Sequence, residues 1–157
     1  MKRFEALFGG IAALALFAMM GLTFADVIGR KFFDQSLTGA VELTELFMLV
    51  MIYCGLPLAS LAGEHIVFDL LDRFLPATAL RWQRAISHGL TAAIVLAGAV
   101  VVYHRAVRTM EYGDTTATLV IRLGPFHYMV AAMLVVTALV HVYLAWCALR
   151  GQAKAAQ

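Results

Sequence analysis

Four long stretches of the sequence carry no charged residue and are mostly apolar, and they restrict the folds that the chain can adopt. They cover residues 6–25, 46–63, 85–104 and 123–149. The hydrocarbon core of a bilayer is roughly 30 Å thick, and a helix rises about 1.5 Å per residue. A helix of this length is therefore about long enough to cross it. Because hydrocarbon offers the backbone no hydrogen-bond partner, and the stretches are too long for barrel strands, each is predicted to be a membrane-spanning helix.

The composition agrees with a membrane environment. Hydrophobic residues make up 62% of the chain and charged residues 14%, and the mean hydropathy is +0.84. These values lie far from those of soluble globular domains. We therefore expect an all-α integral membrane protein, formed by residues 1–157 as a single membrane domain. The four spans are predicted at about residues 6–27, 42–63, 83–106 and 123–149.

The first span has a second interpretation. Lys2 and Arg3 precede it, and Thr23-Phe24-Ala25 resembles a small-residue cleavage site, as in a secretory signal. Its uncharged stretch is longer than the roughly 7 to 15 residues of a signal sequence core, which favours a retained helix.

The positions of lysine and arginine predict the orientation, because cytoplasmic loops carry an excess of both. An even number of spans puts both termini on one side. Seven basic residues lie on that side and five on the other: Lys2, Arg3, Arg73, Arg81, Arg84, Arg150 and Lys154 against Arg30, Lys31, Arg105, Arg108 and Arg122. We expect cytoplasmic termini. The net charge of +2 is divided between both faces and does not indicate nucleic-acid binding.

Two glutamates lie one turn apart at the start of the second span. Ser36 or Thr38 is predicted to cap this helix, and Glu42 and Glu45 follow in its first turns, where the helix dipole favours negative charge. They have two interpretations. They anchor the helix end at the interface, or they pair with a basic residue, for which Arg30 is the best candidate.

Small residues recur at spacings of four on three of the predicted helices. Such stripes let helix backbones approach closely in lipid. They comprise Gly21, Ala25 and Gly29; Gly55, Ala59 and Gly63; and Gly89, Ala93 and Ala97.

A short amphipathic segment follows the second span. Gly63 is expected to end that span, Glu64 and His65 to lie at the membrane boundary, and Pro76 to stop the next helix. Residues 66–75 are apolar over most of a helical surface, but ten residues cannot cross a bilayer. We predict a surface helix that lies on membrane lipids or packs against a partner subunit.

The ordered spacing of several residues resembles the small membrane subunit, or Q subunit, of the tripartite ATP-independent periplasmic (TRAP) transporters. The similar positions are Arg30, Phe32, Phe33, Glu42-Leu43, Gly55, Gly63-x-His65-Ile66-x-x-Asp69 and Leu75-Pro76. The chain departs from the usual pattern at Lys31, Val50, Leu61 and Ala62. The resemblance covers roughly the first half of the chain, and the four-span layout extends it.

This resemblance implies a subunit of the bacterial inner membrane that performs no chemistry and has no catalytic, cofactor or metal residues. In the family, a periplasmic solute-binding protein delivers an organic acid to a large multi-span subunit, which moves it inward with sodium. The small subunit braces the large one and offers a surface to the binding protein. By this resemblance Arg30 and Glu42 organise the outer end of the first two helices, and His65 and Asp69 the cytoplasmic turn. Glu45, Gly55 and Gly63 are further candidate interface or structural residues.

A rival interpretation is a haem-binding membrane cytochrome. His88 and His104 lie on the third span, and His127 and His141 on the fourth, so that on antiparallel helices they match in depth as two pairs. Imidazoles are good axial ligands of haem iron. However, residues 88 and 104 point about 160° apart around a helix, so both cannot face the fourth span. A stand-alone structural or regulatory membrane protein is the third class of function.

Overall fold

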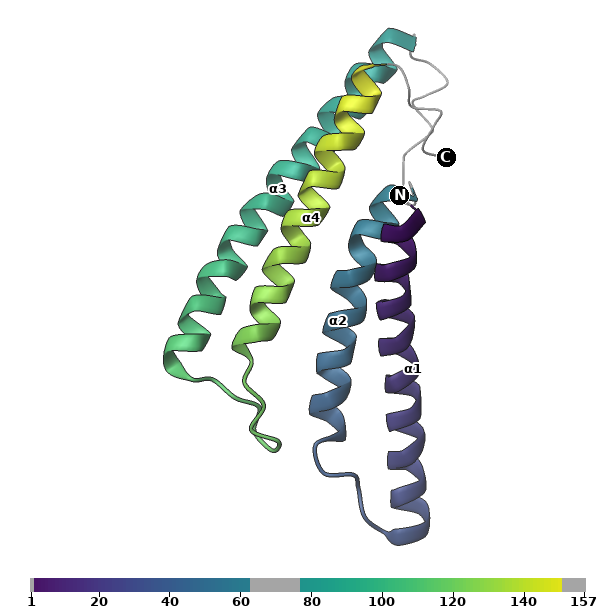
Figure 1. Cartoon of the computed structure of the whole chain (residues 1–157), viewed down its shortest axis with the longest axis vertical. Coiled ribbons are helices and arrows are strands. Elements are labelled where there is room, and N and C mark those ends of the chain that lie inside the picture. The colour runs from purple at the N-terminus through teal and green to yellow at the C-terminus, as the bar shows by residue number, and fades with distance from the viewer. Residues whose placement is uncertain (1, 63–76, 151–157) are drawn as a thin grey trace.

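The computed structural model describes residues 2–62 and 77–150, and all four of its elements are helices. They form two helical hairpins, α1–α2 and α3–α4, which are inclined to each other (Figure 1). The helices are α1 (Lys2–Phe33), α2 (Ala40–Leu61), α3 (Ala77–Tyr112) and α4 (Gly124–Leu149).

All four helices are long and apolar enough to cross a membrane, which confirms the prediction of four apolar spans. The bounds of α2 and α4 lie within two residues of those predicted, whereas α1 and α3 extend further at both ends. These extensions carry charged residues, because a helix keeps its backbone hydrogen bonds after it leaves the apolar layer. Hydropathy therefore located the apolar segments and not the helix ends.

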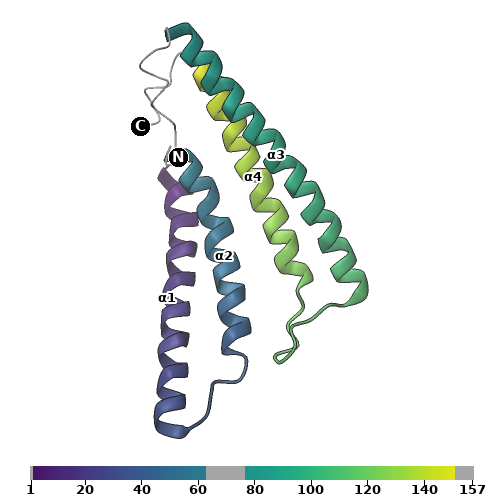
Figure 2. The ribbon, with the colours of Figure 1, turned by 180° about the vertical axis from the view of Figure 1, so that it is seen from behind.

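The helices stand in a row in the order α1, α2, α4, α3. Within the described ranges, α1 packs only on α2 and α3 packs only on α4, while α2 and α4 join the two hairpins. The view from behind shows the same order (Figure 2). The connections 34–39 and 113–123 lie at one end of the molecule, called here the linker end. The start of α1, the ends of α2 and α4 and the start of α3 lie at the opposite, terminal end.

The contact between α3 and α4 uses small residues at a spacing of seven. On α3 the buried positions include Ala85, Ala92, Ala99 and Ala106, and on α4 they include Gly124, Ala131 and Ala138. A seven-residue period keeps one side of a helix against its neighbour over several turns. The predicted stripe of Gly89, Ala93 and Ala97 is instead exposed within the chain. The sequence thus has two small-residue faces on α3, and only the face with a spacing of seven packs on α4.

The start of α2 differs from the prediction. The residue that caps it is Gly39, with φ of 80° and no side-chain hydrogen bond, so the predicted cap at Ser36 or Thr38 is wrong. Ser36 instead donates to Asp26 on α1. The predicted surface helix at residues 66–75, together with Gly63, His65 and Asp69, lies outside the described residues.

Candidate functional site

Asp26 organises the linker end of α1. Its carboxylate lies 2.7 Å from the Arg30 guanidinium one turn later. It also accepts hydrogen bonds from the Ser36 hydroxyl at 3.1 Å and the Leu37 amide at 2.8 Å. One carboxylate therefore both pairs with its own helix and fixes the connection that leads to α2. Charge-assisted hydrogen bonds of this kind are stronger than neutral ones.

Glu42 holds the other connection. Its two carboxylate oxygens accept hydrogen bonds from the backbone amides of Thr118 and Leu119, at 2.6 and 2.9 Å. The ion-pair partner of Arg30 is Asp26, on its own helix. The predicted pairing of Arg30 with Glu42 is therefore wrong. Glu42 does tie distant segments together, because it lies on α2 and binds backbone amides of the connection between α3 and α4.

The segment that Glu42 binds is a small hairpin between α3 and α4. The Thr116 amide donates to the Ile121 carbonyl at 3.0 Å, and the Ile121 amide donates to the Thr116 hydroxyl at 3.1 Å. Thr115 and Arg122 form an antiparallel bridge one step further out. These bonds give the tip a fixed shape, so its two amides are presented to Glu42 together.

Gly39 completes this contact. It has a positive φ of 80°, and a Cβ atom there would overlap the side chain of Leu119. Both its conformation and its closeness to Leu119 require the absence of a side chain. We call Glu42 and Gly39, with the tip residues Thr118 and Leu119, the linker clamp.

The other two site residues predicted on α2 make no such contact. Glu45 is exposed one turn after Glu42, and a Cβ atom built on Gly55 has no heavy atom within 4 Å among the described residues. Neither is explained by packing within the described part of the chain. Their predicted role at a subunit interface stays a prediction.

A buried polar chain joins three helices toward the terminal end. The Ser60 hydroxyl of α2 donates to the Leu56 carbonyl at 3.0 Å and lies 3.3 Å from Nε2 of His141 on α4. Nδ1 of His141 lies 3.3 Å from Nδ1 of His88 on α3. Ser60 and His141 are only 1% and 2% exposed. Hydrogen bonding satisfies polar atoms that neither lipid nor water reaches.

The histidine geometry does not suit haem. His88 and His141 do meet in depth, but their Nδ1 atoms are 3.3 Å apart, whereas two axial ligands lie on opposite sides of a metal with about 2.0 Å to each nitrogen. His104 is exposed, and His127 Nδ1 bonds the Leu123 carbonyl of its own helix at 2.9 Å. The second predicted pair therefore does not form.

Two of these anchoring residues were missed by the sequence analysis. Asp26 could have been recognised by its spacing of four from Arg30 at the end of an apolar segment. Ser60 gave no comparable signal, because serine is common in membrane helices and usually bonds its own backbone. The Thr118 and Leu119 amides belong to the backbone and have no signature in the sequence.

The arrangement is suited to holding helices and linkers in place. No group of three or more histidine, cysteine, aspartate or glutamate side chains that could hold a metal occurs in the described ranges. The carboxylates of Asp26 and Glu42 bind backbone amides, and His141 binds Ser60 and His88. These contacts position structure, and none of them prepares a nucleophile.

Comparison with known families matches residues 19–151 to the family described as tripartite ATP-independent periplasmic transporters, DctQ component. Neither the comparison with curated proteins nor that with solved structures finds a match. The family match covers most of the chain, including α2, α3 and α4 and the second half of α1. The chain therefore belongs to the DctQ family and is a multi-pass membrane component of a TRAP transporter, not an enzyme.

Proposed function

We propose that this chain braces the large multi-span subunit of a sodium-coupled transporter in a bacterial inner membrane. The solute is an organic acid delivered by a periplasmic binding protein. Membership of the DctQ family supports this role. The whole chain acts as one membrane domain with cytoplasmic termini, so that the linker end faces the periplasm. Arg30, Glu42, Glu45 and Gly55, with Gly63, His65 and Asp69, belong to the structural or subunit-contact set.

The observation that carries the proposal is the linker clamp. Glu42 binds two amides of the connection between α3 and α4, while Asp26 binds the connection between α1 and α2. The two connections are thus held as one surface, although they belong to different hairpins. A preorganised surface costs little conformational entropy when a partner docks. A brace that receives a binding protein requires such a surface.

Purification from the native membrane in a mild detergent tests the proposal. The tagged chain should co-purify with one much larger multi-span subunit in a fixed ratio, identified by mass spectrometry. Recovery of the chain alone, or with a coloured redox complex that has a haem Soret band, would refute the brace.

Labelling with a membrane-impermeant maleimide tests the orientation, with Cys54 and Cys147 replaced by alanine. Ala117→Cys at the linker end should react in intact spheroplasts, and Arg81→Cys at the terminal end, two residues before the predicted third span, only after permeabilisation. Both side chains are exposed, so access alone decides the result. The opposite pattern would reverse the proposed topology.

A further inference from the structure

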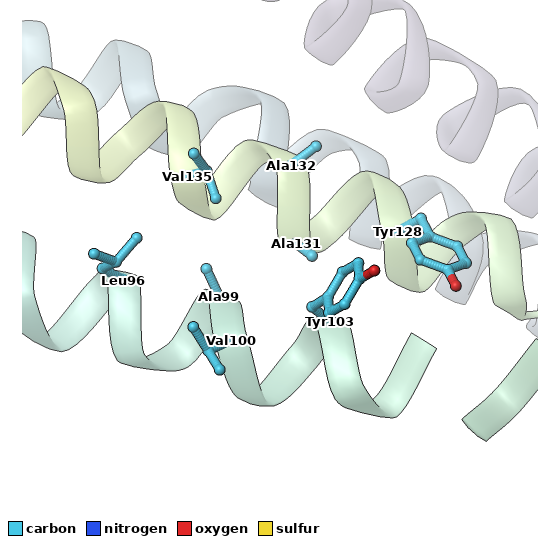
Figure 3. A pocket seen from close by; sticks show the side chains of 8 residues that line it. All are labelled: Leu96, Ala99, Val100, Tyr103, Tyr128, Ala131, Ala132 and Val135. Atoms are coloured by element: carbon cyan, nitrogen blue, oxygen red, sulfur yellow. The ribbon is translucent and has the colours of Figure 1, made fainter. Parts of the chain in front are cut away.

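A hollow of about 510 Å³ lies at the linker end, between the last turn of α3 and the connection to α4. Unlike the apolar groove along the same two helices (Figure 3), it is bounded on one side by a loop. Thr109 and Met110 line the hollow from α3, and Thr115, Val120 and Arg122 line it from the connection. The loop therefore stands away from the end of its own helix.

The tip of this connection, residues 117–120, lies against α2 instead. Figure 1 shows the connection reaching from its own hairpin toward the start of α2. The contacts are those of the linker clamp: Glu42 binds the amides of Thr118 and Leu119, and the Leu119 side chain lies beside Gly39. The position of the tip thus depends on residues of the other hairpin.

Val120 has an unfavourable backbone conformation in this position. Its φ is 54°, in the left-handed region that a β-branched residue disfavours. The other described residues with a positive φ are Asp34, Gly39 and Gly113, which are residue types that adopt this region more readily. Glycine or asparagine is the usual residue where a hairpin loop requires a positive φ. The side chain at position 120 therefore conflicts with the shape of the loop.

Packing does not force this conformation on Val120, because 66% of the residue is exposed. Hydrogen bonds fix the residues on both sides of it: Ile121 pairs with Thr116, and the amide of Leu119 is bound by Glu42. Strained conformations persist where the surrounding structure over-determines them. The bond to Glu42 therefore helps to keep Val120 strained, and its loss would allow the tip to relax.

We propose that the tip is a strained latch with two positions. In the observed position Glu42 holds it against α2, and Val120 is displayed at the linker end. When the bonds to Glu42 are lost, Val120 leaves the left-handed region, the tip moves toward the hollow, and Val120 packs on Met110. Glu42 thereby controls whether an apolar side chain is presented at the linker end. The latch is a property of this chain and does not depend on the brace function.

Relief of the strain tests the first part of the proposal. Val120→Gly removes the steric cost of the positive φ and should slow hydrogen exchange at the Thr118 and Leu119 amides about fivefold. Val120→Asn, which tolerates this region with less backbone freedom than glycine, should act in the same direction. The matched control is Asp34→Gly, because Asp34 has a φ of 52° in the other connection and should leave both amides unchanged. Unchanged or faster exchange in both Val120 variants would overturn the latch.

Spin labels at three exposed positions test the movement, with Ala117 on the tip, Lys31 on α1 and Tyr112 at the end of α3. In Glu42→Ala, the distance from 117 to 31 should increase and that from 117 to 112 should decrease. The distance from 31 to 112 joins the two hairpins and should stay the same, because the contact between α2 and α4 remains. Addition of Val120→Gly should reverse part of the movement, since the tip then gains less by leaving the clamp.

Two results would reject the latch. Unchanged distances from position 117 would show that the tip has a single position. A change between 31 and 112 as large as the others would show that the hairpins themselves pivot. Neither result bears on whether the chain co-purifies with a large subunit, so the latch and the brace fail separately.

Discussion

The linker clamp and the Ser60–His141–His88 chain both tie one hairpin to the other, but they use different chemistry. In the clamp, a carboxylate at the linker end binds two backbone amides. Toward the terminal end, the buried Ser60 hydroxyl and His141 imidazole bind each other, and His141 also binds the half-buried His88. The first contact depends on one side chain, that of Glu42, and on the backbone shape of the loop that it binds. The second specifies three side chains at once.

This difference has a physical basis. A carboxylate keeps its charge where water and headgroups are near, and backbone amides are available in any loop of the right shape. Deeper in the spans a charge is costly, so neutral groups that can both donate and accept are favoured. The clamp should therefore tolerate changes in loop side chains but not in loop conformation. The buried chain should respond to each of its side chains.

The largest expected effect is on loop conformation. Gly39→Val puts a β-branched residue at a positive φ and makes it overlap Leu119, so we expect it to destabilise the chain by about 3 kcal/mol. Gly113→Val is the control, because Gly113 also has a positive φ, of 69°, but has open space around it. The control should lose about 1 to 2 kcal/mol. Unfolding in mixed micelles measures both, and equal losses would show that the contact with Leu119 contributes nothing.

Removal of the clamp charge should have an intermediate effect. Glu42→Gln keeps the size of the side chain but replaces a carboxylate that accepts two amides by a neutral group with one acceptor oxygen. Hydrogen exchange at Thr118 and Leu119 should become about tenfold faster. Glu45→Gln, one turn later and exposed, should leave these amides unchanged. Unchanged protection of these amides in Glu42→Gln would show that the Glu42 carboxylate does not hold the tip.

The smallest expected effect is in the buried chain. His141→Leu removes the central member and should cost about 1 kcal/mol, because hydrogen bonds between membrane helices average roughly 0.6 and reach about 1.7 kcal/mol. His104→Leu, an exposed histidine on α3, is the control and should be close to neutral. A loss larger than that of Gly39→Val would reverse the order of the two anchors.

Hydropathy was sufficient to predict the four helices, because each span must satisfy its own backbone wherever its neighbours lie. It was not sufficient to predict their ends, since Asp26 and Arg30 continue α1 beyond the apolar stretch. The sequence singled out Arg30 and Glu42, and the suggested pairing between them was wrong. Arg30 has a partner in its own helix, whereas the partners of Glu42 lie 76 and 77 residues away.

The sequence by itself determined the membrane environment, the four apolar helices and the family, because length, hydropathy and ordered spacing are local properties of the chain. The tertiary structure decided that α2 and α4 join the hairpins, and that the stripe of alanines seven apart on α3 is the one that packs. It also decided that Glu42 binds the tip of a distant hairpin. Hydrocarbon is equally compatible with every apolar face, so in lipid the choice among faces depends on close packing and a few polar contacts.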